Sequence, residues 1–332
     1  MHNSLALPFR RTEITLVAVI VMVGIVFSFS SPYFLTLSNA TDLVEAYSVT
    51  TILAAGVFVV LVSGGIDISF AAVASVSQYA AAFAATRYGV PALPAIGLAC
   101  VLGILLGSIN AILTYYLRVV SIIITIATAS IYYALLIYFT DGTEIYNLPD
   151  WWTERVVFLR FEMVPGDVGR ITLPMVIMTA VVIVTHLIMT RTHAGRQIYV
   201  LGGNPEAASR IGVNVLRIQV IVYGYLGFLA GLAGFVQAHR VHQAVPTAMF
   251  GTELSVLAVA ILGGASLVGG VGSMGGVVLG VLLLAMLQNG LNLLGVSSYF
   301  FGVVIGLAIL ISISLTGYAE RHMRQRRRVG TG

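Results

Sequence analysis

Ten apolar segments alternate with polar segments along this chain. They lie near residues 13–30, 47–63, 68–86, 93–117, 119–140, 171–190, 218–238, 250–268, 274–294 and 298–317. Most of them approach the roughly 20 residues that an apolar helix needs to cross a bilayer. In the hydrocarbon core, only helices and closed barrels pair all of their backbone polar groups internally. The pattern therefore predicts an all-α, polytopic membrane protein with about ten transmembrane helices, in which residues 1–332 form a single domain.

Charged residues in the polar segments predict how the chain is threaded. Arg10 and Arg11 precede the first apolar segment, and the stretch 141–170 carries six acidic residues against three arginines. The stretch 191–217 carries four arginines against one acidic residue, and the tail 318–332 carries five more arginines. Because basic residues mark cytoplasmic loops, we expect both termini and 191–217 inside and 141–170 outside. The number of crossings agrees with this placement only if 250–268 also crosses.

Composition excludes several classes of protein. The chain of 332 residues is 58% hydrophobic and 9% charged, whereas a soluble domain has about 25% charged residues. The net charge of +4 comes from arginines near the ends of spans, which argues against nucleic-acid binding. Cys100 is the only cysteine and lies in an apolar segment, so no internal disulfide can form. No metalloprotease or hydrolase motif appears, and we expect neither a metal site nor an enzyme.

One apolar stretch is interrupted at Ser63-Gly64-Gly65-Ile66-Asp67-Ile68-Ser69. Adjacent glycines weaken a helix by about 1 kcal/mol each relative to alanine. An ionisable group such as Asp67 is costly in lipid and often marks a transport pathway. Two interpretations follow: a broken helix lining a solute path, or a short turn on the inner side in which Asp67 caps the next helix.

A second glycine-rich stretch, 263–276, contains seven glycines in fourteen residues. Small residues allow membrane helices to pack closely, and glycine reaches backbone conformations that other residues avoid. A phosphate-binding loop would need a Gly-Lys-Ser/Thr sequence, which does not follow here. The stretch therefore indicates close helix packing and argues against nucleotide binding.

Polar side chains within the spans are candidates for contact with a solute. They are Asn110, Glu253, Gln288, Asn289 and Asn292. Asn289 and Asn292 are three residues apart and share a helix face. Amides can donate and accept hydrogen bonds without carrying charge, which suits a hydroxylated solute, but they also serve as hydrogen bonds between membrane helices.

Aromatic residues carry less information. Trp151 and Trp152 in the 141–170 loop could sit in the aromatic belt at the membrane surface. Five tyrosines could line a sugar path or could simply pack between helices. They are Tyr115, Tyr116, Tyr132, Tyr133 and Tyr138.

The cytoplasmic stretch 191–217 has its own local pattern. Gly202-Gly203 predicts a turn, Asn204 can cap a helix, and Pro205 suits the first position of that helix. The helix would end near Ile211, before Gly212. Such a projecting helix is either a lever for a partner protein or a plain connecting loop.

This stretch is similar to the cytoplasmic coupling loop of permeases in the ribose-type sugar ABC importers. The matching residues are Thr192, Gly195, Arg196, Tyr199, Gly202, Gly203, Asn204, Ala207, Ala208 and Gly212. Two further blocks agree, 63–69 and 251–276, the latter followed by 288–292. The resemblance extends over residues 45–316. Two departures are Arg118-Val-Val-Ser-Ile, which lacks the family's proline, and Ser255 in place of an aspartate.

The resemblance implies a type II importer permease with ten helices that works as a dimer, with a second copy or a related permease. Two cytoplasmic ABC ATPase subunits would dock on the loop around 195–212, and they would carry ATP and Mg, so this chain would hold no cofactor. A periplasmic binding protein would deliver a sugar or similar small polar solute across the bacterial inner membrane. The alternative is an ion-coupled secondary transporter, which would need buried carboxylates; only Asp67 and Glu253 qualify.

Overall fold

The computed structural model describes residues 6–303, 306–307 and 310, and within these the chain is mostly helical. The longer helices are α1 (Ala6–Ser30), α2 (Leu37–Ala46), α3 (Ser48–Val62), α4 (Phe70–Tyr88), α5 (Ala92–Leu117), α6 (Ser121–Thr140), α8 (Leu173–Arg191), α9 (His193–Gly203), α11 (Val215–Val241), α12 (Glu253–Leu262) and α13 (Met274–Leu293). Three short ones are α7 (Asp150–Thr153), α10 (Pro205–Arg210) and the 3₁₀ turn η1 (Ser298–Phe300). The expected last span, 298–317, lies mostly outside the described residues, and the tail 318–332 lies entirely outside them.

Six of the described helices are long and apolar enough to cross a membrane, or seven if α2 and α3 count as one span bent by 46°. The six are α1, α5, α6, α8, α11 and α13. Helix α4 is not among them, and its sequence includes the polar residues Gln78 and Arg87. The expectation of a polytopic membrane protein is therefore confirmed, while the count within the described part of the chain is lower than ten.

The expected span 250–268 is not one continuous helix. Its helical part, α12, has 10 residues, or about 15 Å of rise, half the thickness of a bilayer core of about 30 Å. A Cβ atom placed on Gly263, directly after α12, would lie 2.5 Å from the carbonyl oxygen of Gly276. The helix therefore ends where its backbone meets the start of α13.

The stretch 141–170 contains a β-hairpin, so the all-α prediction was incomplete. Strands β1 (Val157–Val164) and β2 (Asp167–Thr172) pair antiparallel. The turn between them is Pro165-Gly166, where Gly166 has a φ of 87°. Proline and glycine favour such turns, and β-branched and aromatic residues favour strands.

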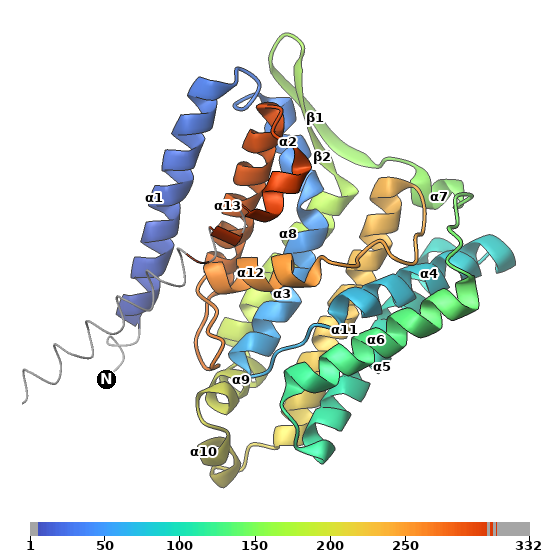
Figure 1. The fold of residues 1–332 in the computed structure, drawn as a ribbon, viewed down its shortest axis with the longest axis vertical. Helices are drawn as coiled ribbons and strands as arrows, with labels where there is room; N and C mark the ends of the chain where they lie inside the picture. The colour runs from blue at the N-terminus through green and yellow to red at the C-terminus, as the bar shows by residue number, and fades with distance from the viewer. Residues whose placement is uncertain (1–5, 304–305, 308–309, 311–332) are drawn as a thin grey trace, which may run out of the picture.

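The hairpin and the pair α9–α10 lie at opposite ends of the molecule (Figure 1). Helix α8 runs from the hairpin end to α9, and α11 returns from the α10 end (Figure 1). The acidic stretch and the arginine-rich stretch therefore occupy opposite ends, as the charge pattern predicts.

The backbones of helices α11 and α5 are in direct contact, with almost no side chain between them. A Cβ atom placed on Gly103 of α5 would lie 2.8 Å from the carbonyl carbon of Gly227 on α11. The same test at Gly231 gives 2.7 Å to the carbonyl carbon of Ala99. Glycines four residues apart share a helix face, and in membranes such faces allow close packing. This is the most extensive helix–helix contact among the described residues.

Candidate functional site

Helix α9 turns the chain back against the core directly after α8. The Oγ1 atom of Thr192 caps the helix by accepting a hydrogen bond from the Gly195 backbone N–H at 3.1 Å. A Cβ atom placed on Gly195 would lie 2.8 Å from the carbonyl carbon of Met189, so α9 lies directly on the end of α8. The expected turn at Gly202-Gly203 is instead the last turn of this helix, which ends at Gly203.

The short helix expected after Asn204 is confirmed as α10. The Oδ1 atom of Asn204 accepts a hydrogen bond from the Ala207 N–H at 3.0 Å, and Pro205 takes the first position. Glu206 lies in the first turn, where the helix dipole favours an acidic side chain. Gly212 follows α10 with a φ of 86°.

The residues from Gly195 to Gly212 that match the family's coupling loop divide into two sets by exposure. Gly195, Gly202 and Ala208 are buried, and Tyr199 is half-buried. The exposed set is Arg196, Gly203, Asn204, Ala207 and Gly212. At this end of the molecule, the two helices therefore expose one face and pack against the rest of the protein with the other.

The buried side of α9 brings together the three sequence blocks that carry the resemblance. A Cβ atom on Gly202 would overlap the carbonyl oxygen of Val62 and lie 2.6 Å from the Gly270 nitrogen. Blocks far apart in the sequence therefore meet at one place.

The break after α3 is real: residues between Ser63 and Ser69 are not helical. The backbone N–H of Ile66 donates to the Ser121 Oγ at 2.9 Å, and that of Ile68 donates to the Thr125 Oγ1 at 3.2 Å. Irregular backbone at membrane depth persists only where protein or water pairs its polar groups. Hydroxyl groups of α6 supply that pairing here.

Asp67 lies inside this break and is nearly fully buried, with 3% of its surface exposed. Its Oδ1 accepts hydrogen bonds from the backbone N–H and the Oγ of Ser69, both at 2.7 Å. The Nδ2 of Asn110 donates to the same Ser69 Oγ at 2.6 Å. Ser69, and not Asp67, is the residue directly before α4. Asp67 and Asn110 are thus brought together, in a cluster that fixes the break to α5.

The three amides on α13 lie elsewhere, in a pocket of about 370 Å³ against α2. The pocket is lined by Asp42, Leu43, Ala46, Tyr47, Gln288, Asn289, Asn292 and Phe301. Asn289 and Asn39 exchange two hydrogen bonds, at 3.0 and 2.9 Å, and the Tyr47 hydroxyl donates to the Oε1 of Gln288. Sequence reasoning missed the contribution of α2, although its polar residues stand out beside the apolar α3.

Glu253 occupies a third position, as the first residue of α12. The Tyr133 hydroxyl donates to its Oε1 at 3.4 Å, and the ring of Tyr133 packs edge-on against Phe250. The six candidate pathway residues therefore form three separate groups.

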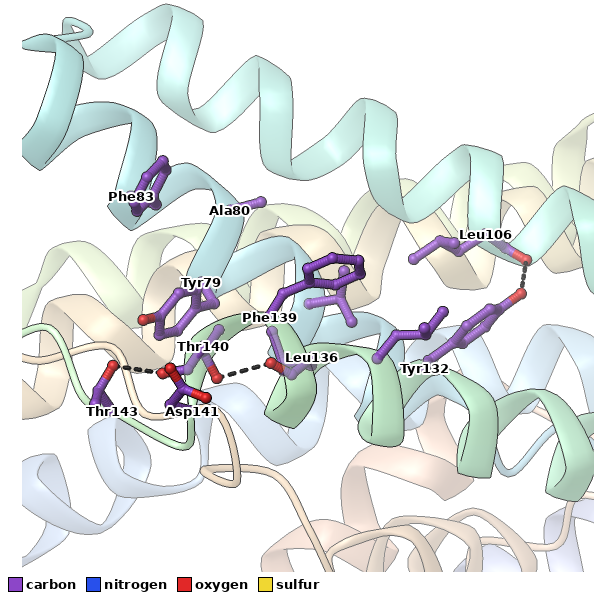
Figure 2. Close-up of a pocket in the computed structure, with 12 residues that line it drawn as sticks. Tyr79, Ala80, Phe83, Leu106, Tyr132, Leu136, Phe139, Thr140, Asp141 and Thr143 are labelled. Atoms are coloured by element: carbon purple, nitrogen blue, oxygen red, sulfur yellow. Dashed lines mark hydrogen bonds between the residues drawn. The ribbon is translucent and has the colours of Figure 1, made fainter.

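A larger cavity of about 630 Å³ lies between α4, α5 and α6. Tyr132 lines one end, where its hydroxyl donates to the carbonyl oxygen of Leu106 at 3.2 Å (Figure 2). Tyr79, Thr140 and Asp141 gather at the other end (Figure 2). Tyr132 is the one member of the expected tyrosine set that lines this cavity. Apolar side chains make up most of the wall between the two ends.

Trp152 does not sit in an interfacial belt. Its ring is fully buried and stacks on Phe235 with 4.8 Å between ring centroids. Its Nε1–H donates to the Phe235 carbonyl oxygen at 3.2 Å, and the Trp152 carbonyl lies 2.6 Å from the Nδ1 of His239. This residue anchors the 141–170 stretch to α11.

Asp167 ties the hairpin to α2. Its carboxylate accepts hydrogen bonds from the backbone N–H groups of Leu37 at 2.6 Å and Ser38 at 2.8 Å. These hydrogen bonds favour the ionised form and lower the pKa of Asp167. Within the described residues, no three His, Cys, Asp or Glu side chains are grouped as a metal site requires.

Comparisons with known proteins agree on one family. The family model described as "Branched-chain amino acid transport system / permease component" matches residues 39–313. The ribose import permease protein RbsC of Escherichia coli is 36% identical over 302 residues, which cover 90% of this chain and 91% of that protein. The ribose import permease protein RbsC of Bacillus subtilis is 36% identical over 291 residues, 88% of each chain.

A third relative is the D-allose transport system permease protein AlsC of Escherichia coli, 32% identical over 295 residues, which cover 89% of this chain and 88% of that protein. No solved structure matches the chain. The apolar helices and these matches agree with the permease resemblance found in the sequence. The chain belongs to the family of branched-chain amino acid transport system permease components and is a multi-pass membrane permease subunit.

Proposed function

We propose that this permease imports a sugar or a similar small polar solute across the bacterial inner membrane, driven by ATP that a separate chain hydrolyses. The names of the ribose and allose relatives support a sugar. The observation that carries the proposal is the exposed, locally capped surface of α9 and α10, whose opposite face is bound to the core. Such a surface suits a partner that pushes on the permease from one side.

The proposed partners follow from this arrangement. Two cytoplasmic ABC ATPase subunits, which carry ATP and Mg, would bind the exposed residues Arg196, Gly203 and Asn204. A periplasmic binding protein would dock at the hairpin end, and a second permease, identical or related, would complete the channel. We also propose ten crossings, with both termini and the tail 318–332 in the cytoplasm. In that threading, the segment between α11 and α13 also crosses the membrane, and α12 is its helical part.

The amide pocket between α2 and α13 is the proposed contact site for the solute. Its volume of about 370 Å³ lies in the range of small-molecule sites. Gln288, Asn289 and Asn292 offer donors and acceptors without net charge. Asp67 and Asn110 are buried and bonded to Ser69, so we assign them to holding the break in place.

Charge reversal at Arg196 tests the ATPase contact. Arg196 is exposed on α9, so Arg196→Glu should leave folding intact and weaken docking. A loss of about 1.4 kcal/mol would lower the affinity tenfold. Co-purification with the ATPase should fall accordingly, and ATP-driven uptake with it. Arg87→Glu, at the exposed end of α4, controls for charge reversal itself. Equal retention of the ATPase by both variants would contradict the proposal.

The energy source and the solute are tested together in vesicles that contain the whole transporter. Uptake of labelled D-ribose should continue when the proton gradient is collapsed and ATP is kept. Loss of uptake on collapse would instead favour the ion-coupled secondary transporter. Uptake of L-leucine but not of D-ribose would contradict the sugar assignment and would instead fit the branched-chain amino acids named in the family's description.

A further inference from the structure

The C-terminal end of α9 touches two other chain segments through main-chain atoms. At Gly202, a Cβ atom would overlap the Val62 carbonyl oxygen, 2.6 Å from the Gly270 nitrogen. Real Cβ atoms essentially never come within 3.0 Å of other heavy atoms. Any side chain at this position would therefore force the three segments apart.

Three further glycines complete the contact. A Cβ atom placed on Gly269 would lie 2.7 Å from both the Gly202 oxygen and the Gly64 Cα. Gly269 also has a φ of 93°, a conformation that other residues rarely adopt. The backbone N–H of Gly270 donates to the Val62 carbonyl at 2.8 Å. We call Gly64, Gly202, Gly269 and Gly270 the glycine joint.

Tyr199 adds a second connection one turn earlier in α9. Its hydroxyl donates to the Gly272 carbonyl oxygen at 2.8 Å. Helix α9 is therefore held to the 263–276 stretch at two points, once through backbone and once through a side chain.

Both segments in the joint continue directly into functional candidates. Gly64 opens the break that contains Asp67. The 263–276 stretch links α12, which begins at Glu253, to α13, which carries the amides of the α2 pocket. A displacement of α9 would therefore reach both the break at 63–69 and the 263–276 stretch through a single set of contacts.

We infer that the glycine joint, together with Tyr199, transmits movement of the α9–α10 surface to the break at 63–69 and to the 263–276 stretch. The physical reason is stiffness. Main-chain contacts contain no rotatable side-chain bonds that could absorb a displacement, and close-packed interiors transmit strain. The inference rests on the proposed function, because the movement it transmits comes from an ATPase.

The first experiment needs only the detergent-solubilised chain. Amide hydrogen exchange is measured by mass spectrometry in Gly202→Ala and in Tyr199→Phe, which removes one hydroxyl and keeps the ring. We expect exchange over 63–69 and 263–276 to be about two- to tenfold faster, the range for one lost hydrogen bond, with α5 unchanged.

The matched control is Gly275→Ala, from the same glycine-rich stretch. Its Cβ would meet only the Oε1 of Glu13, at 3.6 Å, an ordinary contact, so exchange should match the wild type. Unchanged exchange in both Tyr199→Phe and Gly202→Ala would overturn the inference, as would an equal effect of Gly275→Ala. This arm decides whether the joint holds these segments, whatever drives the transporter.

The second experiment uses the complex with its ATPase, trapped with vanadate. Trapping should change the exchange at 63–69 in the wild type, and Tyr199→Phe should reduce that change by about twofold or more. An undiminished change in a Tyr199→Phe complex that retains its ATPase would overturn the inference. A wild-type chain that binds no ATPase would instead contradict the proposed function. The first experiment would then test by itself whether the glycine joint holds the two segments.

Discussion

Replacing Gly227 with alanine perturbs one of the closest helix contacts in the fold. A Cβ atom at this position would overlap the Gly103 carbonyl oxygen and lie 2.7 Å from its carbonyl carbon. Ordinary contacts begin at 3.4 Å, so α5 and α11 must separate locally by at least about 0.7 Å, and a close-packed interior resists such a shift. Backbone atoms on both sides leave no flexible side chain to move away.

The expected cost follows from two opposing effects. Overpacking a well-packed core costs about 1–3 kcal/mol, and alanine gains about 1 kcal/mol over glycine in a helix. The difference is a net destabilisation of about 0–2 kcal/mol. Because only backbone atoms face the new Cβ, we expect Gly227→Ala near the upper end of this range, or a few degrees in melting temperature. Gly97→Ala on α5 is the matched control, because no atom lies within 4 Å of a Cβ placed there.

The assay is thermal unfolding of the purified chain in one detergent, followed by the intrinsic fluorescence of Trp151 and Trp152. We expect Gly227→Ala to melt below the wild type and Gly97→Ala to melt at or above it. If Gly227→Ala melted as high as Gly97→Ala, the argument that backbone contact sets the α5–α11 spacing would be refuted.

Two further predictions concern the hairpin end. The hydrogen bonds that lower the pKa of Asp167 stabilise the fold at neutral pH, and this stabilisation should disappear as the pH falls through that lowered pKa. Asp167→Asn should lack this stabilisation at every pH. The measurement is hydrogen exchange at the Leu37 and Ser38 amides as a function of pH. Trp152→Ala should destabilise the chain by about 3–5 kcal/mol. Trp152→Phe should cost less, because it keeps a ring beside Phe235 and loses a hydrogen bond worth about 0.5–1.5 kcal/mol together with a smaller buried volume. Equal melting temperatures for the two variants would contradict the role of ring stacking.

Local sequence signals predicted local structure well. Asn204, Pro205 and Gly212 each act on the helix beside them, so α10 could be located from the sequence. The apolar segments likewise placed the long spans, because burial in lipid depends on composition over about 20 residues. The hairpin was missed although Pro165-Gly166 marks its turn, because Arg160 and Glu162 interrupt the apolar residues of β1 and leave no long apolar segment there.

Features that depend on distant partners could not be predicted in this way. Helix α12 is short because Gly263 meets Gly276 in space. The six polar pathway candidates separate into three groups because α2, α5 and α6 each provide different hydrogen-bond partners. The glycines of α5 and α11 carry a four-residue spacing visible in the sequence, but nothing in the sequence pairs one helix with the other.

The hydrogen bonds from the break at 63–69 to α6 limit how the protein can rearrange. Ser121 and Thr125 pair the N–H groups of Ile66 and Ile68, and each such group left unpaired away from water costs several kcal/mol. Helix α6 therefore cannot rotate about its own axis or slide along the break without leaving these donors unpaired. Any conformational cycle must carry the two segments as one rigid body or admit water to that spot.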